Sequence, residues 1–272
     1  MNAKTPAQDG AVERMRGARG DVLWETVALA QYEHGPEDVA LGGYVHQYEG
    51  CAGPDQELSV QMRELIAVTL LSAKSEHRFA ANHIRRLYRL GVTNAVIVEA
   101  YCAAAPVFGR SMLVHAMNAI RRANDPSNHE GALPTGGEPK TLADFPELHL
   151  GGDAPAGAAS GEGLMSRPAW QYVAAIDPTL AERAATLFDA TFLHGADSAT
   201  HGLGAAAREL IAIPGLCMRG ALKQASQHIA RVVQLGATKR QVLEAISAAI
   251  PMGGLLTLEL GVEAMLLAGL QA

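Results

Sequence analysis

A block of residues recurs 145 positions later in this chain. RELIAV begins at Arg63, and RELIAI begins at Arg208. Without insertion or deletion, the same offset relates His83 to His228, Leu90-Gly91 to Leu235-Gly236, Thr93 to Thr238, Glu99-Ala100 to Glu244-Ala245, Pro106 to Pro251 and Gly109 to Gly254. Two stretches that keep one register over this length predict two copies of one structural unit, produced by duplication.

Each copy has the residue pattern of a set of antiparallel helices. In the first copy, apolar residues at helical spacing predict helices over 64–74 and 75–90, a third from about 94, and a fourth from 109 to about 122. Gly91 suits the left-handed position after a helix and Thr93 suits an N-cap, whereas Pro106 should break or kink the third helix. The second copy repeats this plan, and Pro214-Gly215 predicts a kink in its first helix.

The composition agrees with an all-α protein built around a sizeable core. Hydrophobic residues make up 49% of the 272 residues and charged residues 18%, while the alternation of β-branched residues typical of strands is scarce. A further helical pair is expected before each copy, near 22–48 and 168–194, with Asp177-Pro178 as a helix start. The predicted organisation is a flexible N-terminus over 1–20, a first helical repeat over 21–123, a Gly/Pro/Ala-rich linker over 124–167 and a second helical repeat over 168–272.

Charge, hydropathy and cysteine usage exclude several classes of function. A net charge of −6 gives no electrostatic footprint for nucleic acid. The N-terminus lacks a hydrophobic signal core and no apolar run approaches the length of a membrane span, so a cytoplasmic protein without membrane contact is expected. The cysteines, Cys51, Cys102 and Cys217, form no CxxC pair, which argues against a disulfide framework or a zinc site. Cys217 is expected to be a small core residue.

In both copies a glutamate precedes a histidine by nineteen residues: Glu64 and His83 in the first, Glu209 and His228 in the second. Antiparallel packing of the two helices would bring each pair together. A carboxylate that holds one imidazole nitrogen fixes the tautomer and raises the basicity of the other nitrogen. Such a pair transfers a proton without metal or cofactor, and neither is expected here. A structural interpretation stays open, because each glutamate follows an arginine at the predicted start of a helix, where it would favour the helix dipole.

The tandem pattern of RELI, His, Leu-Gly, Glu, Pro and Gly resembles the carboxymuconolactone decarboxylase and alkylhydroperoxidase D superfamily over both copies. The resemblance implies two all-helical units that form a pseudo-dimer within one chain. It also implies a homo-oligomer, with a trimer of pseudo-dimers favoured by symmetry. In the peroxidase branch of that superfamily the glutamate and histidine flank a CxxC pair. Here those cysteine positions hold Glu76 and Phe79 in the first copy and Ala221 and Gln224 in the second, which excludes a thiol peroxidase.

The decarboxylase branch, which lacks the cysteines, is the closer resemblance. It implies a cofactor-independent lyase or isomerase that acts by Glu/His proton transfer on a small carboxylated, cyclic or aromatic metabolite. The first copy is the expected active site, because Glu76 supplies a second acid one turn before the position where that branch often has one. The candidate catalytic residues are His83, Glu64 and Glu76, with Glu209 and His228 as counterparts in the second copy. The candidate substrate-binding residues are His77, Phe79, Tyr101, Phe108, Met112 and His115.

The alternative is a non-catalytic helical scaffold that binds partners and keeps the Glu–His pairs as remnants. A His83 sealed in a packed core would favour it. A metal site formed by Glu64, Glu76 and His83 lacks a recognisable ligand spacing. The remaining charged residues are expected on the surface: Arg78, Arg85, Arg86 and Arg89 on a solvated helix face, and Glu99 and Glu244 in surface ion pairs.

Overall fold

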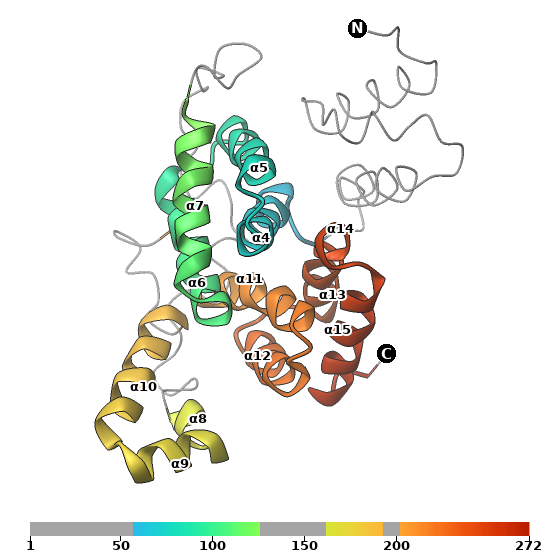
Figure 1. Ribbon diagram of the computed structural model, residues 1–272. Coiled ribbons are helices and arrows are strands. Elements are labelled where there is room, and N and C mark those ends of the chain that lie inside the picture. The colour runs from blue at the N-terminus through green and yellow to red at the C-terminus, as the bar shows by residue number, and fades with distance from the viewer. Residues whose placement is uncertain (1–56, 126–161, 193–201, 272) are drawn as a thin grey trace, which may run out of the picture.

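The computed structural model describes residues 57–125, 162–192 and 202–271, where every regular element is a helix (Figure 1). The all-α class predicted from the sequence is confirmed. The flexible N-terminus over 1–20, the helical pair near 22–48 and most of the linker over 124–167 lie outside the described residues.

The helices fall into three groups along the chain. The first unit, as we call α4–α7, contains α4 (Val60–Ala73), α5 (His77–Arg89), α6 (Asn94–Phe108) and α7 (Arg110–Ala123). A smaller group follows: α8 (Glu162–Met165), α9 (Pro168–Ile176) and α10 (Pro178–Phe192). The second unit contains α11 (Ala205–Met218), α12 (Leu222–Gln234), α13 (Lys239–Ser247), α14 (Ile250–Gly253) and α15 (Leu255–Leu267).

Helices in the two units start in the register of the sequence repeat. Val60 and Ala205, His77 and Leu222, Asn94 and Lys239, and Arg110 and Leu255 are the first residues of corresponding helices, each pair 145 positions apart. The first helix of the first unit begins four residues earlier than predicted, because Ser59 caps it by accepting a hydrogen bond from the Met62 N–H at 3.1 Å. The common origin of the two units stays an inference from the sequence.

Local capping explains where the third helix of each unit begins. The Thr93 side chain accepts from the Val96 N–H, and Thr238 forms a reciprocal capping box with Gln241. The preceding helices end at glycines in the left-handed region, with φ of 85° at Gly91 and 100° at Gly236. These four predicted boundaries are confirmed.

The helix break that the sequence predicts is absent at Pro106 and present next to Pro251. The helix α6 continues through Pro106 to Phe108 and ends at Gly109, whose φ is 80°. Pro106 and Cys102, whose carbonyl loses its helical donor, are both exposed, so water can satisfy that carbonyl. In the second unit the helix is interrupted after Ser247, and Pro251 lies in the first turn of α14. Pro214 lies within α11, which spans Ala205–Met218 as one helix.

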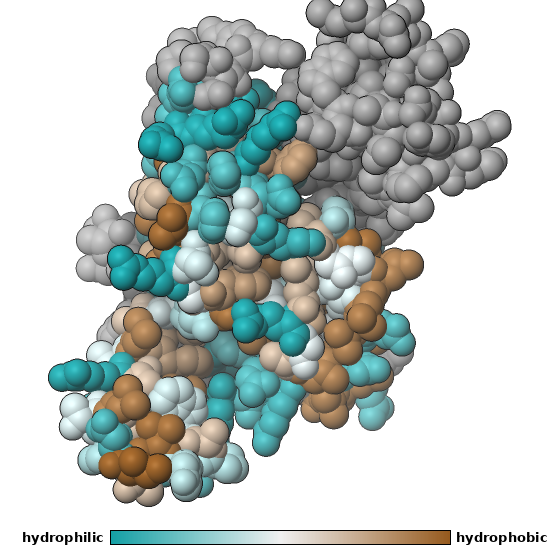
Figure 2. Space-filling view, viewed as in Figure 1, coloured by the Kyte–Doolittle hydropathy of each residue, from teal (hydrophilic) through white to brown (hydrophobic). Residues whose placement is uncertain are grey.

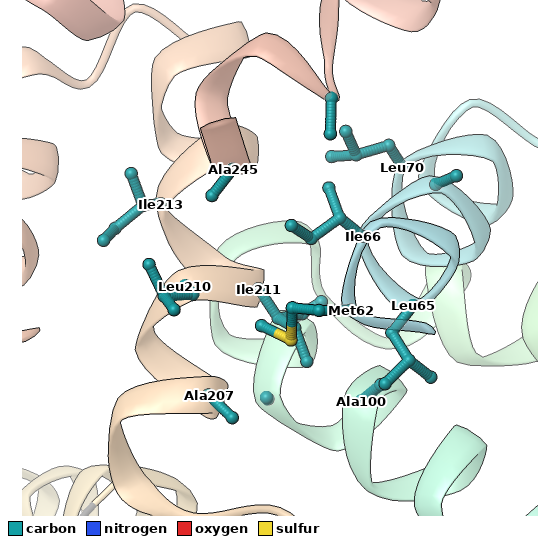
Figure 3. Close-up of a cluster of buried hydrophobic side chains, with 14 of the residues drawn as sticks. Met62, Leu65, Ile66, Leu70, Ala100, Ala207, Leu210, Ile211, Ile213 and Ala245 are labelled. Carbon is teal, nitrogen blue, oxygen red and sulfur yellow. The ribbon is translucent and has the colours of Figure 1, made fainter. Parts of the chain in front are cut away.

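The core lies where the first helices of the two units meet (Figure 3). Both α4 and α11 are apolar on nearly all sides, which is the pattern of a helix surrounded by protein. The close-up shows α4 side chains facing α11 side chains across a shared core, with contributions from α6 and α13. The labelled residues are Met62, Leu65, Ile66, Leu70, Ala100, Ala207, Leu210, Ile211, Ile213 and Ala245, all buried. One core therefore joins both units.

Two glutamates bind across the interface between the units in a reciprocal manner. The Glu99 carboxylate accepts hydrogen bonds from the backbone N–H groups of Gly202 at 2.7 Å and Leu203 at 2.9 Å, just before α11. The Glu244 carboxylate accepts from the N–H of Leu58 at 2.8 Å, just before α4, and from Arg63 Nη2 at 3.0 Å. The expected ion pairs are present, since Glu244 pairs with Arg63 and Arg240 and Glu99 pairs with Arg208. The expectation of an ordinary surface position is wrong, because each glutamate also binds the start of the other unit's first helix.

The smaller group α8–α10 projects from the side of the molecule (Figure 1). Its helix pair confirms the one predicted near 168–194, and Asp177 Oδ1 caps α10 by accepting from the Leu180 N–H at 2.9 Å. Apolar side chains are exposed on this group and on α15 (Figure 2). They include Ile176, Leu180 and Leu187 in the group, and Leu255, Leu256, Leu266 and Leu267 on α15. Exposed apolar patches of this kind are typical of contact surfaces.

Candidate functional site

The first site residue, Glu64, lies in the second turn of α4 and is completely buried. Ser59 supplies the N-cap, and no acidic residue lies in the first turn. The structural interpretation of Glu64 as a residue that favours the helix dipole is therefore wrong. Glu209 has the same place in α11, where Gly204 is the N-cap, and it is also completely buried.

The histidine of the first unit lies on α5 and meets this carboxylate. The His83 Nδ1 is 2.6 Å from Glu64 Oε2, and the imidazole is 3% exposed. The chain reverses direction in the turn between α4 and α5. Ser75 lies in this turn with a φ of 65°, in the left-handed region that residues other than glycine rarely adopt. The nineteen-residue spacing thus brings acid and imidazole into direct contact.

The second unit repeats the contact with similar geometry. The His228 Nδ1 lies 2.5 Å from Glu209 Oε2, and His228 is 5% exposed. At these short distances the Nδ1–H is the donor and the carboxylate oxygen is the acceptor, because an ionised carboxylate has no hydrogen to donate. In the first unit the other ring nitrogen, Nε2, then carries the lone pair, an assignment made from the hydrogen-bond partner. In the second unit Arg231 Nη2 also lies 3.1 Å from His228 Nδ1.

An arginine completes each pair, and the sequence interpretation missed it. Arg86 Nε is 3.4 Å from Glu64 Oε1, and Arg231 Nη2 is 2.6 Å from Glu209 Oε1. The expectation that Arg86 lies on a solvated face is wrong, because its side chain is only 11% exposed and faces the buried acid. The signal was present: in both copies an arginine follows the histidine by three residues, which places it on the same helix face.

Two phenylalanines of α10 lie against the site of the second unit. The Phe192 ring centroid is 5.2 Å from that of His228 with the rings edge to face, and Phe188 is 6.0 Å away. The guanidinium carbon of Arg231 is 4.7 Å from the Phe188 centroid, and that of Arg167 is 5.7 Å from it. Cation–π contacts of this geometry stabilise a buried guanidinium.

The predicted polar neighbours of His83 divide between the surface and the α5–α7 interface. Glu76 is exposed at the N-cap of α5 and makes no side-chain capping bond. His77 and His115 stack across α5 and α7, with ring centroids 6.1 Å apart and an interplanar angle of 17°. His115 Nδ1 is buried without a hydrogen-bond partner in the described part of the chain. The structure therefore brings these two histidines together and leaves Glu76 in solvent.

The predicted apolar wall residues occupy different surroundings. Tyr101 is buried and its hydroxyl lies 3.0 Å from Ser72 Oγ, and burial raises the pKa of that phenol well above its usual value. Met112 belongs to the core, Phe79 is partly buried, and Phe108 packs against α11. A Cβ added to Gly215 would lie 2.6 Å from the Phe108 ring. Their role as substrate contacts stays a prediction.

The two described cysteines differ in their exposure. Cys102 is exposed, and Cys217 is buried in the core as predicted. Burial raises the pKa of the Cys217 thiol to about 12. Over the described ranges, no three histidine, cysteine or acidic side chains are arranged to hold a metal ion. Among those same residues, no helix combines the length and apolar character needed to cross a membrane.

Comparison with known proteins identifies one family. Residues 185–265 match the model of the carboxymuconolactone decarboxylase family, which confirms the predicted resemblance for the second copy. The matched range runs from α10 into α15 and contains both Glu209 and His228. A search of curated proteins gave no significant match.

Proposed function

Because residues 185–265 match the carboxymuconolactone decarboxylase family, we propose that the chain is a cofactor-independent lyase or isomerase. Its substrate is a small carboxylated metabolite, cyclic or aromatic, and its chemistry is proton transfer by a buried Glu–His pair. Turnover takes place in the first unit at His83. The single observation that carries this proposal is the 2.6 Å contact between His83 Nδ1 and Glu64 Oε2 in a buried environment.

The chemistry follows from the roles that this contact imposes. Glu64 accepts the Nδ1–H and holds the ring, so that Nε2 takes a proton from a carbon next to a carbonyl. When His83 returns that proton to a different carbon of the substrate, the overall reaction is an isomerisation. In decarboxylation the C–C bond to the leaving carbon dioxide breaks, its electron pair stays on the substrate carbon, and a protonated His83 delivers a proton there. Glu64 stabilises the imidazolium in either reaction.

Arg86 makes the buried carboxylate compatible with its role. An isolated carboxylate is costly to bury, and it would take up a proton and stop accepting from the imidazole. The guanidinium near Glu64 Oε1 offsets this cost and leaves Oε2 for His83. We therefore assign Arg86 as a positioning residue that acts through Glu64.

The first unit is preferred because more ionisable groups lie near its histidine helix. His77 and His115 stack beside α5, and Glu76 stands at its start. In the second unit the corresponding helix has Ala221 and Leu222 in place of Glu76 and His77. The second pair, Glu209 and His228, is the structural counterpart.

One observation favours the alternative, a non-catalytic scaffold that binds partners. The exposed fractions of Glu64 and His83 are 0% and 3%, so both groups lie within packed protein. A buried hydrogen-bonded pair also serves to specify the packing of two helices. The enzyme hypothesis and the scaffold hypothesis differ in one testable respect, which is whether any proton transfer depends on His83.

The test uses His83→Gln and His228→Gln in the full chain. Both proteins and the wild type are incubated in heavy water with a panel of small β-keto, lactone and aromatic carboxylic acids. Mass spectrometry detects deuterium incorporation, and a coupled assay detects carbon dioxide. His83→Gln is expected to lower the rate by about 100-fold or more, a typical contribution of general acid–base catalysis, while His228→Gln retains it. A wild-type rate in His83→Gln, or no reaction of the wild type with the whole panel, supports the scaffold instead.

We also propose that copies of the chain associate into a ring, with a trimer favoured. The face of α15 exposes leucines together with Glu259 and Glu263, whereas α7 exposes Val114 and Met117 together with arginines at both ends. An acidic apolar face on one helix complements a basic apolar face on another. Contacts between two different faces generate closed rings when the rotation between copies closes.

A further inference from the structure

Two arginines from separate parts of the chain converge beside the His228 site. Arg231 comes from α12, and Arg167 lies between α8 and α9. Both guanidinium groups lie within cation–π distance of the same ring, that of Phe188, at 4.7 Å and 5.7 Å. The cluster defined by Arg167, Arg231, Phe188, Phe192 and His228 is called the second-unit arginine site below.

The positive charge of this site exceeds its negative charge. One carboxylate, Glu209, pairs with Arg231 at 2.6 Å and also accepts from His228. Arg231 is only 7% exposed, yet its Nε is buried without a hydrogen-bond partner in the described chain, and so is Nε of Arg167. Buried donors of this kind are normally satisfied, so each of these two Nε–H groups can still donate to a bound acceptor. The buried acceptors Glu209 Oε1 and, on α10, Asp189 Oδ1 also lack a hydrogen-bond partner among the described residues.

The electrostatics of Arg167 agree with this interpretation. Burial and then the nearby charge of Arg231 lower the pKa of Arg167, and Glu209 only partly opposes them. In this site and its partner Glu209, two guanidinium groups and one carboxylate leave a single excess positive charge among these three groups. A monoanion would neutralise the site, whereas a phosphate dianion would overcompensate it.

We propose that the second-unit arginine site binds a small organic monoanion, with Arg167 and Arg231 donating to its carboxylate. The planar guanidinium matches a carboxylate in shape and in the direction of its N–H groups. Phe188 and Phe192 provide an aromatic wall, which favours an aromatic or apolar body on the ligand. The site goes beyond the proposed function, because it lies in the second unit and does not depend on His83.

The ligand probe is benzoate, with benzamide as its neutral counterpart of the same shape. Trp170 is a built-in reporter, because it packs against the cluster that contains Phe188 and Phe192. Replacing Trp24, the other tryptophan, by phenylalanine makes the emission specific to Trp170. Titration of this full-length protein measures a dissociation constant without any turnover.

Benzoate is expected to change Trp170 emission saturably, with benzamide binding at least about tenfold more weakly, because a charge-assisted hydrogen bond is lost. Arg167→Gln should weaken benzoate binding by about tenfold or more. Arg167→Lys should weaken it by less, because lysine keeps the positive charge but cannot donate two parallel hydrogen bonds as a guanidinium does. Arg183→Gln, a substitution of an exposed arginine on α10, is the matched control and should leave binding unchanged.

The proposal is overturned by an equal response to benzoate and benzamide, by wild-type affinity in Arg167→Gln, or by no response in a protein with native circular dichroism. Adding His83→Gln to the reporter protein separates the two proposals. Benzoate binding should survive this change even where proton transfer is lost, so either proposal can fail while the other stands.

Discussion

The reciprocal glutamates make the sharpest prediction about stability. Glu244→Ala removes the acceptor for the Leu58 N–H and the partner of Arg63, whose exposed fraction is 2%. Glu99→Ala removes the acceptor for the Gly202 and Leu203 N–H groups. Both changes leave the shared apolar core intact, so their cost reports the interface contacts themselves.

The structure gives different magnitudes for the two substitutions. Loss of Glu244 breaks the 3.0 Å ion pair with Arg63, whose side chain is 2% exposed, and a broken buried pair costs about 3–5 kcal/mol. Arg208, the equivalent cation beside Glu99, lies 3.6 Å from that carboxylate and also donates to the carbonyls of Leu203 and Thr191. Loss of Glu99 should therefore cost only the charge-assisted backbone bonds, about 1.5–3 kcal/mol.

Thermal unfolding followed by circular dichroism measures both effects. For a chain of this size Glu244→Ala should lower Tm by about 6–15 °C, and Glu99→Ala by less. Glu182→Ala, which removes an exposed glutamate on α10, is the control and should change stability by under about 0.5 kcal/mol. A Tm for Glu244→Ala equal to that of Glu182→Ala would refute the reasoning. Adding Arg63→Met to Glu244→Ala should restore part of the loss, since an apolar side chain then replaces the buried guanidinium that has lost its Glu244 partner.

Two further predictions concern the buried thiol and the assembly. Burial raises the pKa of Cys217 to about 12 from 9.0, so the unfolded thiol ionises first as pH rises. Stability should therefore fall between about pH 9 and 12, and less steeply in Cys217→Ala; equal slopes in urea titrations would contradict this. Light scattering should give about three times the 28.6 kDa chain mass, and Leu256→Lys on the exposed face of α15 should reduce it. A single-chain mass at micromolar concentration would exclude the ring.

Much of the fold follows from signals that are local in the sequence. Threonine caps at 93 and 238 and glycine stops at 91 and 236 define helix ends, because the groups that satisfy the backbone lie within a few residues. The Glu–His contact was also predictable, since one short turn connects the two helices and leaves few ways to pack them. A break at Pro106, one of the two predicted outcomes, does not occur, because the effect of a missing donor depends on its exposure, a property of the folded chain.

Contacts between the units could not be predicted from spacing. Glu99 has an ordinary place on an amphipathic helix, and nothing near it in the sequence indicates that residues 202 and 203 lie beside it. The sequence offered one hint, because both the glutamates and their targets obey the 145-residue offset. Arg86 was misplaced for a related reason: an arginine on a polar helix face is usually solvated, and only the buried carboxylate opposite it changes that expectation.

The arginine at the third position after each histidine changes what the Glu–His pair means. A buried acid beside a lone imidazole has one way to lower its electrostatic cost, which is to share or accept a proton. With Arg86 or Arg231 beside its second oxygen, the carboxylate has a cationic partner in addition to the imidazole. A hydrogen bond from Nδ1–H to such a carboxylate leaves the lone pair on Nε2, the state that a general base requires. The second unit then carries Arg167 in addition, a charge that the Glu–His–Arg cluster does not need for its own neutrality. Two units with the same proton-transfer geometry thus differ by one cation, and an anion is the partner that this cation lacks.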